Sequence, residues 1–211
     1  MPTNPKMSTA DWGIILLLSL LWGGAFFMIE LGLRGFPPNT LVFLRMALAV
    51  PPMLFILKFI GHRLPNDRKS WQQLFVLGAI NAALPFILFF WGQTQIDSGL
   101  ASVLNATTPL WGVVTAHFLT RDEKATPSRV IGVLLGIAGI IVMVGTEALG
   151  GISGSVLAQL ACLAATLCYA FAAIYGRTLS QSTMSPMVVA TGQVVTAAIL
   201  MLPVALEFMD R

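Results

Sequence analysis

Long apolar stretches follow one another along this chain and are separated by short polar loops. A helix needs about 20 apolar residues to cross the hydrocarbon core of a bilayer. The pattern therefore predicts an all-α polytopic membrane protein with about seven transmembrane helices. The expected spans cover residues 12–33, 40–60, 71–91, 100–119, 130–145, 155–175 and 186–208.

The composition favours the lipid bilayer as the main environment. Hydrophobic residues make up 56% of the chain, charged residues only 10%, and the mean hydropathy is +0.83. Soluble domains carry about 25% charged residues. The net charge of +3 comes from basic residues in loops, so nucleic-acid binding is not expected. Cys162 and Cys168 lie six residues apart on different faces of one expected helix, and neither a disulfide, a metal site nor a cofactor is predicted.

The basic residues indicate how the chain is oriented. If the N-terminus is cytoplasmic, the cytoplasmic loops collect far more basic residues than the opposite loops, which hold only Arg34 and Arg211. Such a bias is typical of cytoplasmic loops, so the N-terminus is predicted to be cytoplasmic. The residues on the predicted cytoplasmic side are Lys6, Lys58, Arg63, Arg68, Lys69, Arg121, Lys124, Arg129 and Arg177.

A weak internal repeat is also present. A shift of 147 or 148 residues places the first span on the sixth and the second on the seventh, and it aligns Arg45 with Gln193. A five-helix unit has an odd number of spans, so its second copy enters the membrane from the opposite side. Inverted repeats of this kind are common in secondary transporters. We expect a complete unit over 12–146 and a partial, two-helix unit over 151–211.

Several segments resemble the drug/metabolite transporter superfamily, in particular its ten-helix branch built from two EamA domains. The resemblance implies three further helices that this chain lacks. It also implies transport of small metabolites, often amino acids or related organic solutes, across the bacterial inner membrane. The segments that carry it are WGGAFF at 22–27, FLRMA at 43–47, ASVLNATTPLW at 101–111, and Asp122-Glu123, Arg129, Gly132, Gly136 and Gly139.

Arg45 and Glu30 are the charged candidates within the spans. Arg45 lies about five residues into the second span, where a charge is costly and usually has a partner. Glu30 lies at a similar depth in the first span, so the two could form a pair. Arg45 could anchor a substrate carboxylate and Glu30 could exchange a proton. A structural ion pair, or a side chain reaching back to the outer interface, is the alternative.

The polar and aromatic candidates for a substrate cavity lie on five of the expected spans or directly after one of them. Asn105 with Pro109 and Asn81 with Pro85 repeat one arrangement, in which a proline frees the carbonyl four residues earlier and bends the helix. Packing and hydrogen bonding between helices are the alternatives, and close helix contacts are the expected role of Gly132, Gly136 and Gly139. The complete set of cavity candidates is Arg45, Glu30, Trp22, Asn81, Trp91, Gln93, Asn105, Thr108, Pro109, Tyr169 and Gln193.

These features predict a secondary-active transporter of small metabolites that works by alternating access, with export favoured and protons as a candidate coupling ion. The chain carries no Gly-x-Ser-x-Gly, His-Glu-x-x-His or P-loop motif, so no enzyme activity is expected. A channel-like pore and a non-transporting membrane assembly subunit are the alternatives. A second chain or the absent C-terminal helices would be needed to close the cavity. The Arg121-Asp122-Glu123-Lys124 run belongs to a solvated cytoplasmic loop or gates the inner mouth through salt bridges.

Overall fold

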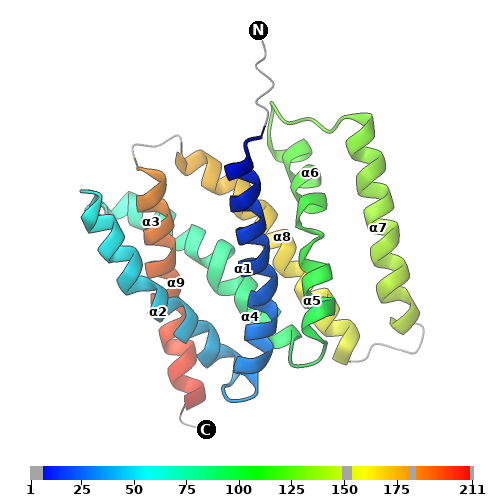
Figure 1. The fold of residues 1–211 in the computed structure, drawn as a ribbon, viewed down its shortest axis with the longest axis horizontal. Coiled ribbons are helices and arrows are strands. Elements are labelled where there is room, and N and C mark those ends of the chain that lie inside the picture. The colour runs from blue at the N-terminus through cyan, green and yellow to red at the C-terminus, as the bar shows by residue number, and fades with distance from the viewer. Residues whose placement is uncertain (1–6, 149–153, 181–183, 210–211) are drawn as a thin grey trace.

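A computed structural model describes residues 7–148, 154–180 and 184–209. Within these ranges the chain is helical and contains no strand (Figure 1). The N-terminus of α1 is held by a capping box, in which the Ser8 side chain accepts from the Asp11 N–H and Asp11 accepts from the Ser8 N–H at 2.7 Å. The elements are α1 (Thr9–Leu33), α2 (Pro38–Phe59), α3 (Arg68–Gly78), η1 (Ala79–Ala83), α4 (Leu84–Gly92), α5 (Ser98–Asn105), α6 (Thr108–Leu119), α7 (Pro127–Ala148), α8 (Gly154–Ser180) and α9 (Pro186–Met209).

Among the described residues, six helical stretches are long and apolar enough to cross a membrane, with α3, η1 and α4 forming one of them. They confirm an all-α polytopic architecture. The predicted fourth span over 100–119 differs, because it is divided into the short helices α5 and α6. The predicted fifth span over 130–145 is longer than expected, since α7 begins at Pro127.

Pro109 explains why the fourth span is divided. A proline has no N–H, so the Asn105 carbonyl loses its normal helical donor. The Thr108 hydroxyl donates to that carbonyl at 2.7 Å, and the Thr107 hydroxyl donates to the Leu104 carbonyl at 2.7 Å. The freed carbonyls are thus satisfied locally, and the chain restarts as a helix with Pro109 in its first turn.

The third span responds differently to its proline. Pro85 removes the donor for the Asn81 carbonyl, and the helix widens into the π-helical turn η1 instead of breaking. The Leu84 N–H donates to the Ala79 carbonyl, five residues back, as a π turn requires. The span therefore remains continuous, with Asn81 at the centre of its irregular turn.

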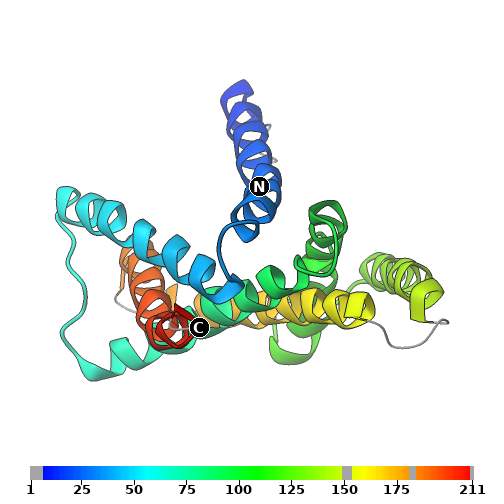
Figure 2. The ribbon, with the colours of Figure 1, turned by 90° about the horizontal axis from the view of Figure 1, so that it is seen from below.

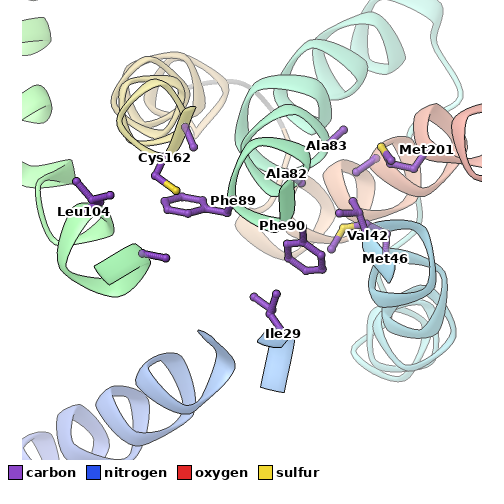
Figure 3. Packing of buried hydrophobic residues seen from close by; sticks show 13 residues of the cluster. Ile29, Val42, Met46, Ala82, Ala83, Phe89, Phe90, Leu104, Cys162 and Met201 are labelled. Atoms are coloured by element: carbon purple, nitrogen blue, oxygen red, sulfur yellow. The ribbon is translucent and has the colours of Figure 1, made fainter. Parts of the chain in front are cut away.

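The core gathers around α8 and between α2 and α9. α8 packs against α4, α5 and α6, while α2 packs along α9. Figure 3 shows Phe89 directed toward the helix that carries Cys162, and Phe90 beside Ile29. A Cβ on Gly92 would lie 2.7 Å from Cys162 Sγ and 3.3 Å from the Ala158 carbonyl oxygen, so α4 and α8 approach closely.

The predicted glycine contacts of α7 are only partly present. A Cβ on Gly136 would meet the Leu110 side chain at 2.4 Å, whereas Gly132 and Gly139 face nothing within 4 Å in the part of the chain that the structure describes. The closest glycine contact lies elsewhere. A Cβ on Gly78 would meet Thr196 Oγ1 at 2.2 Å and the Gln193 carbonyl oxygen at 2.8 Å, which brings α3 against α9.

α1 stands apart from the other helices over most of its length (Figure 2). Ile29 is its buried residue, and its contacts are mainly with α5 near the end where the helix finishes. Trp22 keeps 73% of its surface exposed. The repeat shift of 147 residues aligns Trp22 with Tyr169, which is partly buried between helices, so the two aromatic residues have different surroundings.

Candidate functional site

A cavity of about 360 Å³ lies between the α3–η1 segment, α8 and α9. Its polar groups come from Asn81, Tyr169 and Gln193, and its remaining walls are apolar. It extends from the Asn81–Gln193 level toward the α8–α9 connection, where Gly176 and Pro186 contribute to it. The full lining is Leu77, Asn81, Tyr169, Ala172, Ala173, Gly176, Pro186, Val189, Ala190 and Gln193.

Asn81 and Gln193 form a hydrogen-bonded pair in this cavity. Asn81 Nδ2 donates to Gln193 Oε1 at 2.9 Å, joining residues 112 positions apart. The π turn η1 carries Asn81, and the close approach of Gly78 to α9 brings the two helices together at this level. The Thr196 hydroxyl donates to the Leu74 carbonyl at 2.9 Å and fixes the same interface one turn away. The pair is therefore rigidly positioned, with remaining amide hydrogen-bonding capacity on both side chains.

Tyr169 joins the cavity to an aromatic cluster. Its ring stacks on Phe89 with centroids 6.1 Å apart, and Phe89 meets Phe26 edge-on at 5.7 Å. Such aromatic pairs fix ring orientation as well as burying apolar surface. The cluster connects α1, α4 and α8 beside the cavity.

Arg45 reaches from α2 to α4. Its guanidinium carbon lies over the Phe86 ring, 4.5 Å from the centroid, and 6.0 Å from the centroid of Phe90. Phe89 of the same helix stacks on Tyr169, which lines the cavity. Arg45 therefore lies near the cavity without being part of its lining.

Glu30 does not pair with Arg45. Glu30 Oε2 accepts a hydrogen bond from Ser98 Oγ at 2.6 Å, and Glu30 Oε1 lies 3.5 Å from the Arg34 guanidinium. The Glu30–Arg45 pair that their similar depth suggested is therefore absent, and Glu30 pairs with its neighbour Arg34 instead. The reason is direction around the helix axis, because Glu30 faces the start of α5 whereas Arg45 faces α4.

The remaining sequence candidates are dispersed. Trp91 is 41% exposed, and Pro109 lines a separate cavity of about 280 Å³ formed with the α6–α7 connection. Asn105 and Thr108 are joined by the Thr108 hydroxyl bond within the helix break. Gln93 is only 7% exposed, and its amide finds no hydrogen-bond partner among the described residues. The structure thus brings together Asn81, Tyr169 and Gln193, places Arg45 nearby, and leaves the other candidates apart.

Two groups near the site were not predicted. Phe86 and Phe90 are four residues apart and share the helix face that receives Arg45, a spacing that is visible in the sequence. Ala172, Ala173 and Gly176 give the cavity its space along α8. Small residues on an apolar helix are too common for such a wall to be recognised from sequence alone.

Comparison with known proteins identifies the family. The EamA-like transporter family matches residues 11–145, which is more than half of the chain. The chain belongs to this family. It is therefore a multi-pass membrane protein related to transporters.

Individual relatives agree with this assignment. The EamA-like chain is 25% identical over 164 residues to "Uncharacterized transporter YoaV" of Bacillus subtilis, covering 77% of the chain and 56% of that protein. It is 26% identical over 165 residues to "Uncharacterized inner membrane transporter YedA" of Escherichia coli K12, covering 78% and 52%. A "Probable terminal-alkyne amino-acid exporter" of Streptantibioticus cattleyicolor is 28% identical over 138 residues, covering 65% and 46%. The chain thus spans about half the length of the curated relatives it matches, and no solved structure matches it.

One charged contact of the EamA-like chain joins the C-terminal part of α8 to the α6–α7 connection. Arg177, near the end of α8, contacts Asp122 at 2.5 Å and Glu123 at 2.6 Å in the α6–α7 connection. We call these three residues the Arg177 cluster. The pKa of the Asp122 carboxyl lies below its ordinary value, because it accepts from its own backbone N–H and because Arg177 donates to it. The carboxylate is therefore ionised at neutral pH.

Proposed function

We propose that this chain forms the substrate-binding part of a secondary-active transporter that moves small organic solutes by alternating access. The observation that carries the proposal is the cavity between α3–η1, α8 and α9, which holds the Asn81–Gln193 pair within apolar walls. Its volume of about 360 Å³ lies in the range of small-molecule sites, which is about 300–1,000 Å³.

The proposed mechanism needs two structural units that move relative to each other. We assign 12–146 to one five-helix unit and 151–211 to the first two helices of an inverted copy. α8 then comes from the second unit but packs among helices of the first, and α2 packs on its aligned counterpart α9. A site between such units can be exposed to either side when one unit rotates against the other. The cavity lies at this boundary.

The proposed direction of transport is export. The loops at the N-terminal end of α1 carry most of the basic residues, so we assign that end to the cytoplasm. The cavity reaches Gly176 near the end of α8 and Pro186 at the start of α9. These two helix ends lie at the same end of the molecule as the start of α1 (Figure 1). A solute would thus enter from the cytoplasm. The relative named as an amino-acid exporter supports amino acids or related solutes as the substrate class.

An assembly subunit is the second candidate, favoured by the exposure of α1. Trp22 and most of the first two-thirds of α1 have no protein cover among the described residues. Additional helices, from a second chain or from the absent part of the repeat, would cover that surface. In that case the chain binds solute only as part of a larger assembly.

Counterflow in proteoliposomes tests the proposal. A panel of labelled amino acids and organic acids is expected to give saturable uptake that is accelerated by unlabelled solute inside.

A pH gradient imposed across the proteoliposome membrane is expected to drive this uptake. Glu30→Gln is expected to abolish the uptake driven by the pH gradient while leaving counterflow intact. Glu207→Gln, which alters an exposed carboxylate on α9, is the matched control. Linear, non-saturating flux would favour a pore, and no flux from folded protein would favour the assembly subunit. Uptake driven by the pH gradient that survives Glu30→Gln would show that Glu30 does not carry the coupled proton.

The Arg177 cluster ties α8 to the α6–α7 connection, so alternating access requires this contact to break and reform. We expect Arg177→Gln to accelerate backbone hydrogen exchange over residues 120–126 several-fold, because the connection loses its anchor. Arg121→Gln removes a positive charge from the α6–α7 connection itself, outside the Arg177 cluster, and is expected to leave exchange unchanged. The ratio of exchange rates between Arg177→Gln and the wild type is expected to stay constant between about pH 5 and about pH 8, because a carboxyl with a lowered pKa loses its contribution only as the pH falls through that pKa. Equal exchange in the wild type and Arg177→Gln would show that the cluster restrains nothing.

A further inference from the structure

Arg45 is a charged residue well inside a predicted span. α2 begins at Pro38, so Arg45 lies seven residues along the helix, or roughly 10 Å at about 1.5 Å per residue. Its neighbours Val42 and Met46 on the same helix are buried in the apolar core. A cation at such a depth normally pairs with an acidic group or faces a functional cavity.

Arg45 lies against aromatic faces rather than against a carboxylate of the described residues. Within residues 7–148, 154–180 and 184–209 the structure contains no ion pair to Arg45, and the acidic residue nearest in depth, Glu30, is held by Ser98 and Arg34. The guanidinium instead lies over Phe86 and close to Phe90. A guanidinium on an aromatic face interacts through its flat surface, so the N–H donors in its plane stay available.

The available donors fit one chemical group. Five N–H donors in a fixed planar fork match the two oxygens of a carboxylate, and paired charge-assisted hydrogen bonds are both strong and directional. No described carboxylate of the chain occupies this place. An anionic ligand would supply the missing partner.

Tyr169 connects this cation to the proposed solute cavity. Tyr169 stacks on Phe89 of α4, the same helix whose Phe86 and Phe90 rings receive Arg45. Tyr169 also lines the cavity together with Asn81 and Gln193. Phe86, Phe89 and Phe90 belong to two consecutive turns of α4. A ligand whose carboxylate meets Arg45 would therefore have an aromatic surface next to its apolar part and amide groups beyond Tyr169.

We propose that Arg45 is the anion-binding residue of the transport site, and that the substrates are small organic carboxylates with an apolar body. The inference rests on the proposed transport function for its biological role, but it concerns binding and is testable without flux. The carboxylate is bound by Arg45, and the apolar body lies toward the rings of α4 and Tyr169.

Matched acid and amide probes test this assignment by calorimetry on the purified chain. The probes are 3-phenylpropionate with 3-phenylpropionamide, and N-acetylleucine with its amide. In the wild type we expect the acid of at least one pair to bind at least about tenfold more tightly than its amide, because only the acid carries the charge that Arg45 recognises. Arg45→Gln is expected to equalise acid and amide while retaining the weaker amide binding, which shows that the variant is folded. Arg45→Lys is expected to keep part of the preference, because it keeps the charge but loses the planar fork.

Lys58→Gln removes a positive charge from an exposed position near the other end of α2 and is expected to keep the full acid preference. Equal binding of acid and amide by the wild type, a preference that survives Arg45→Gln, or no binding of either acid up to about 10 mM would each overturn the assignment. Acid-selective binding without counterflow would retain the anion site and remove the transport function. Counterflow of neutral solutes without acid preference would retain the transport function and remove the anion site.

Discussion

Gly78→Ala is expected to destabilise the protein, whereas Gly139→Ala is expected to leave its stability unchanged or to raise it. Both glycines lie on apolar helices, α3 and α7, and alanine is the better helix former at either position by about 1 kcal/mol. At Gly78 the new methyl group would lie 2.2 Å from Thr196 Oγ1, 2.8 Å from the Gln193 carbonyl oxygen and 3.1 Å from the Ala197 nitrogen. Overpacking of this kind costs about 1–3 kcal/mol, so the contact outweighs the gain in helix propensity. Thermal melting of the two variants in the same detergent measures the difference.

A second variant shows whether the backbone of α9 is the obstacle. Thr196→Ala removes the closest side-chain atom, but the Gln193 carbonyl oxygen remains 2.8 Å from the new methyl group. Gly78→Ala combined with Thr196→Ala is therefore expected to stay destabilised. Recovery of the wild-type melting temperature in the double variant would assign the clash to the threonine alone. A Gly78→Ala variant that melts like Gly139→Ala would contradict the close approach of α3 and α9.

Hydrophobic patterning was sufficient to predict the class of protein and most of the spans, because the length of an apolar helix is set by the bilayer. It was not sufficient to predict how two similar prolines act. Asn81–Pro85 and Asn105–Pro109 have the same spacing, yet the first gives a π turn and the second divides a helix. The residues between asparagine and proline differ. Ala83 and Leu84 offer no side-chain donor, whereas Thr107 and Thr108 at the matching positions satisfy the carbonyls that the break exposes. This difference is present in the sequence but becomes interpretable only with the hydrogen bonds known.

The number of residues between a side chain and the end of its span gives its position along the membrane normal, but not its direction around the helix axis. For that reason Glu30 and Arg45, at similar depths, have separate partners. The glycine pattern has the same weakness. Two of the three predicted glycine contacts of α7 are absent among the described residues, whereas Gly78 and Gly92, which were not singled out, lie against the backbone of neighbouring helices. The convergence of Asn81, Tyr169 and Gln193 depends on contacts between segments that are distant in sequence. The repeat alignment singled out Gln193 but gave no indication of Asn81 as its partner.

Variants of the Asn81–Gln193 pair can distinguish a structural role from a functional one, because both residues can be made apolar together. Asn81→Leu and Gln193→Leu are each expected to lower stability, since either change leaves the other amide without its partner at a cost of about 1–3 kcal/mol. Replacing both amides by leucine removes donor and acceptor together, and such a change is nearly neutral for stability. The double variant is therefore expected to recover most of the melting temperature that the single variants lose.

Transport is expected to respond in the opposite way. The double variant lacks the two amides in the cavity, so counterflow is expected to remain reduced by at least about tenfold, the equivalent of one lost hydrogen bond to solute. Gln72→Leu makes the same chemical change at an exposed position of α3, outside the cavity, and is expected to retain both stability and counterflow. A double variant that transports like the wild type would reduce the pair to a packing contact between α9 and the π turn. Restored stability with lost counterflow would instead place solute recognition at these two amides, since no defect in folding would remain to explain the loss.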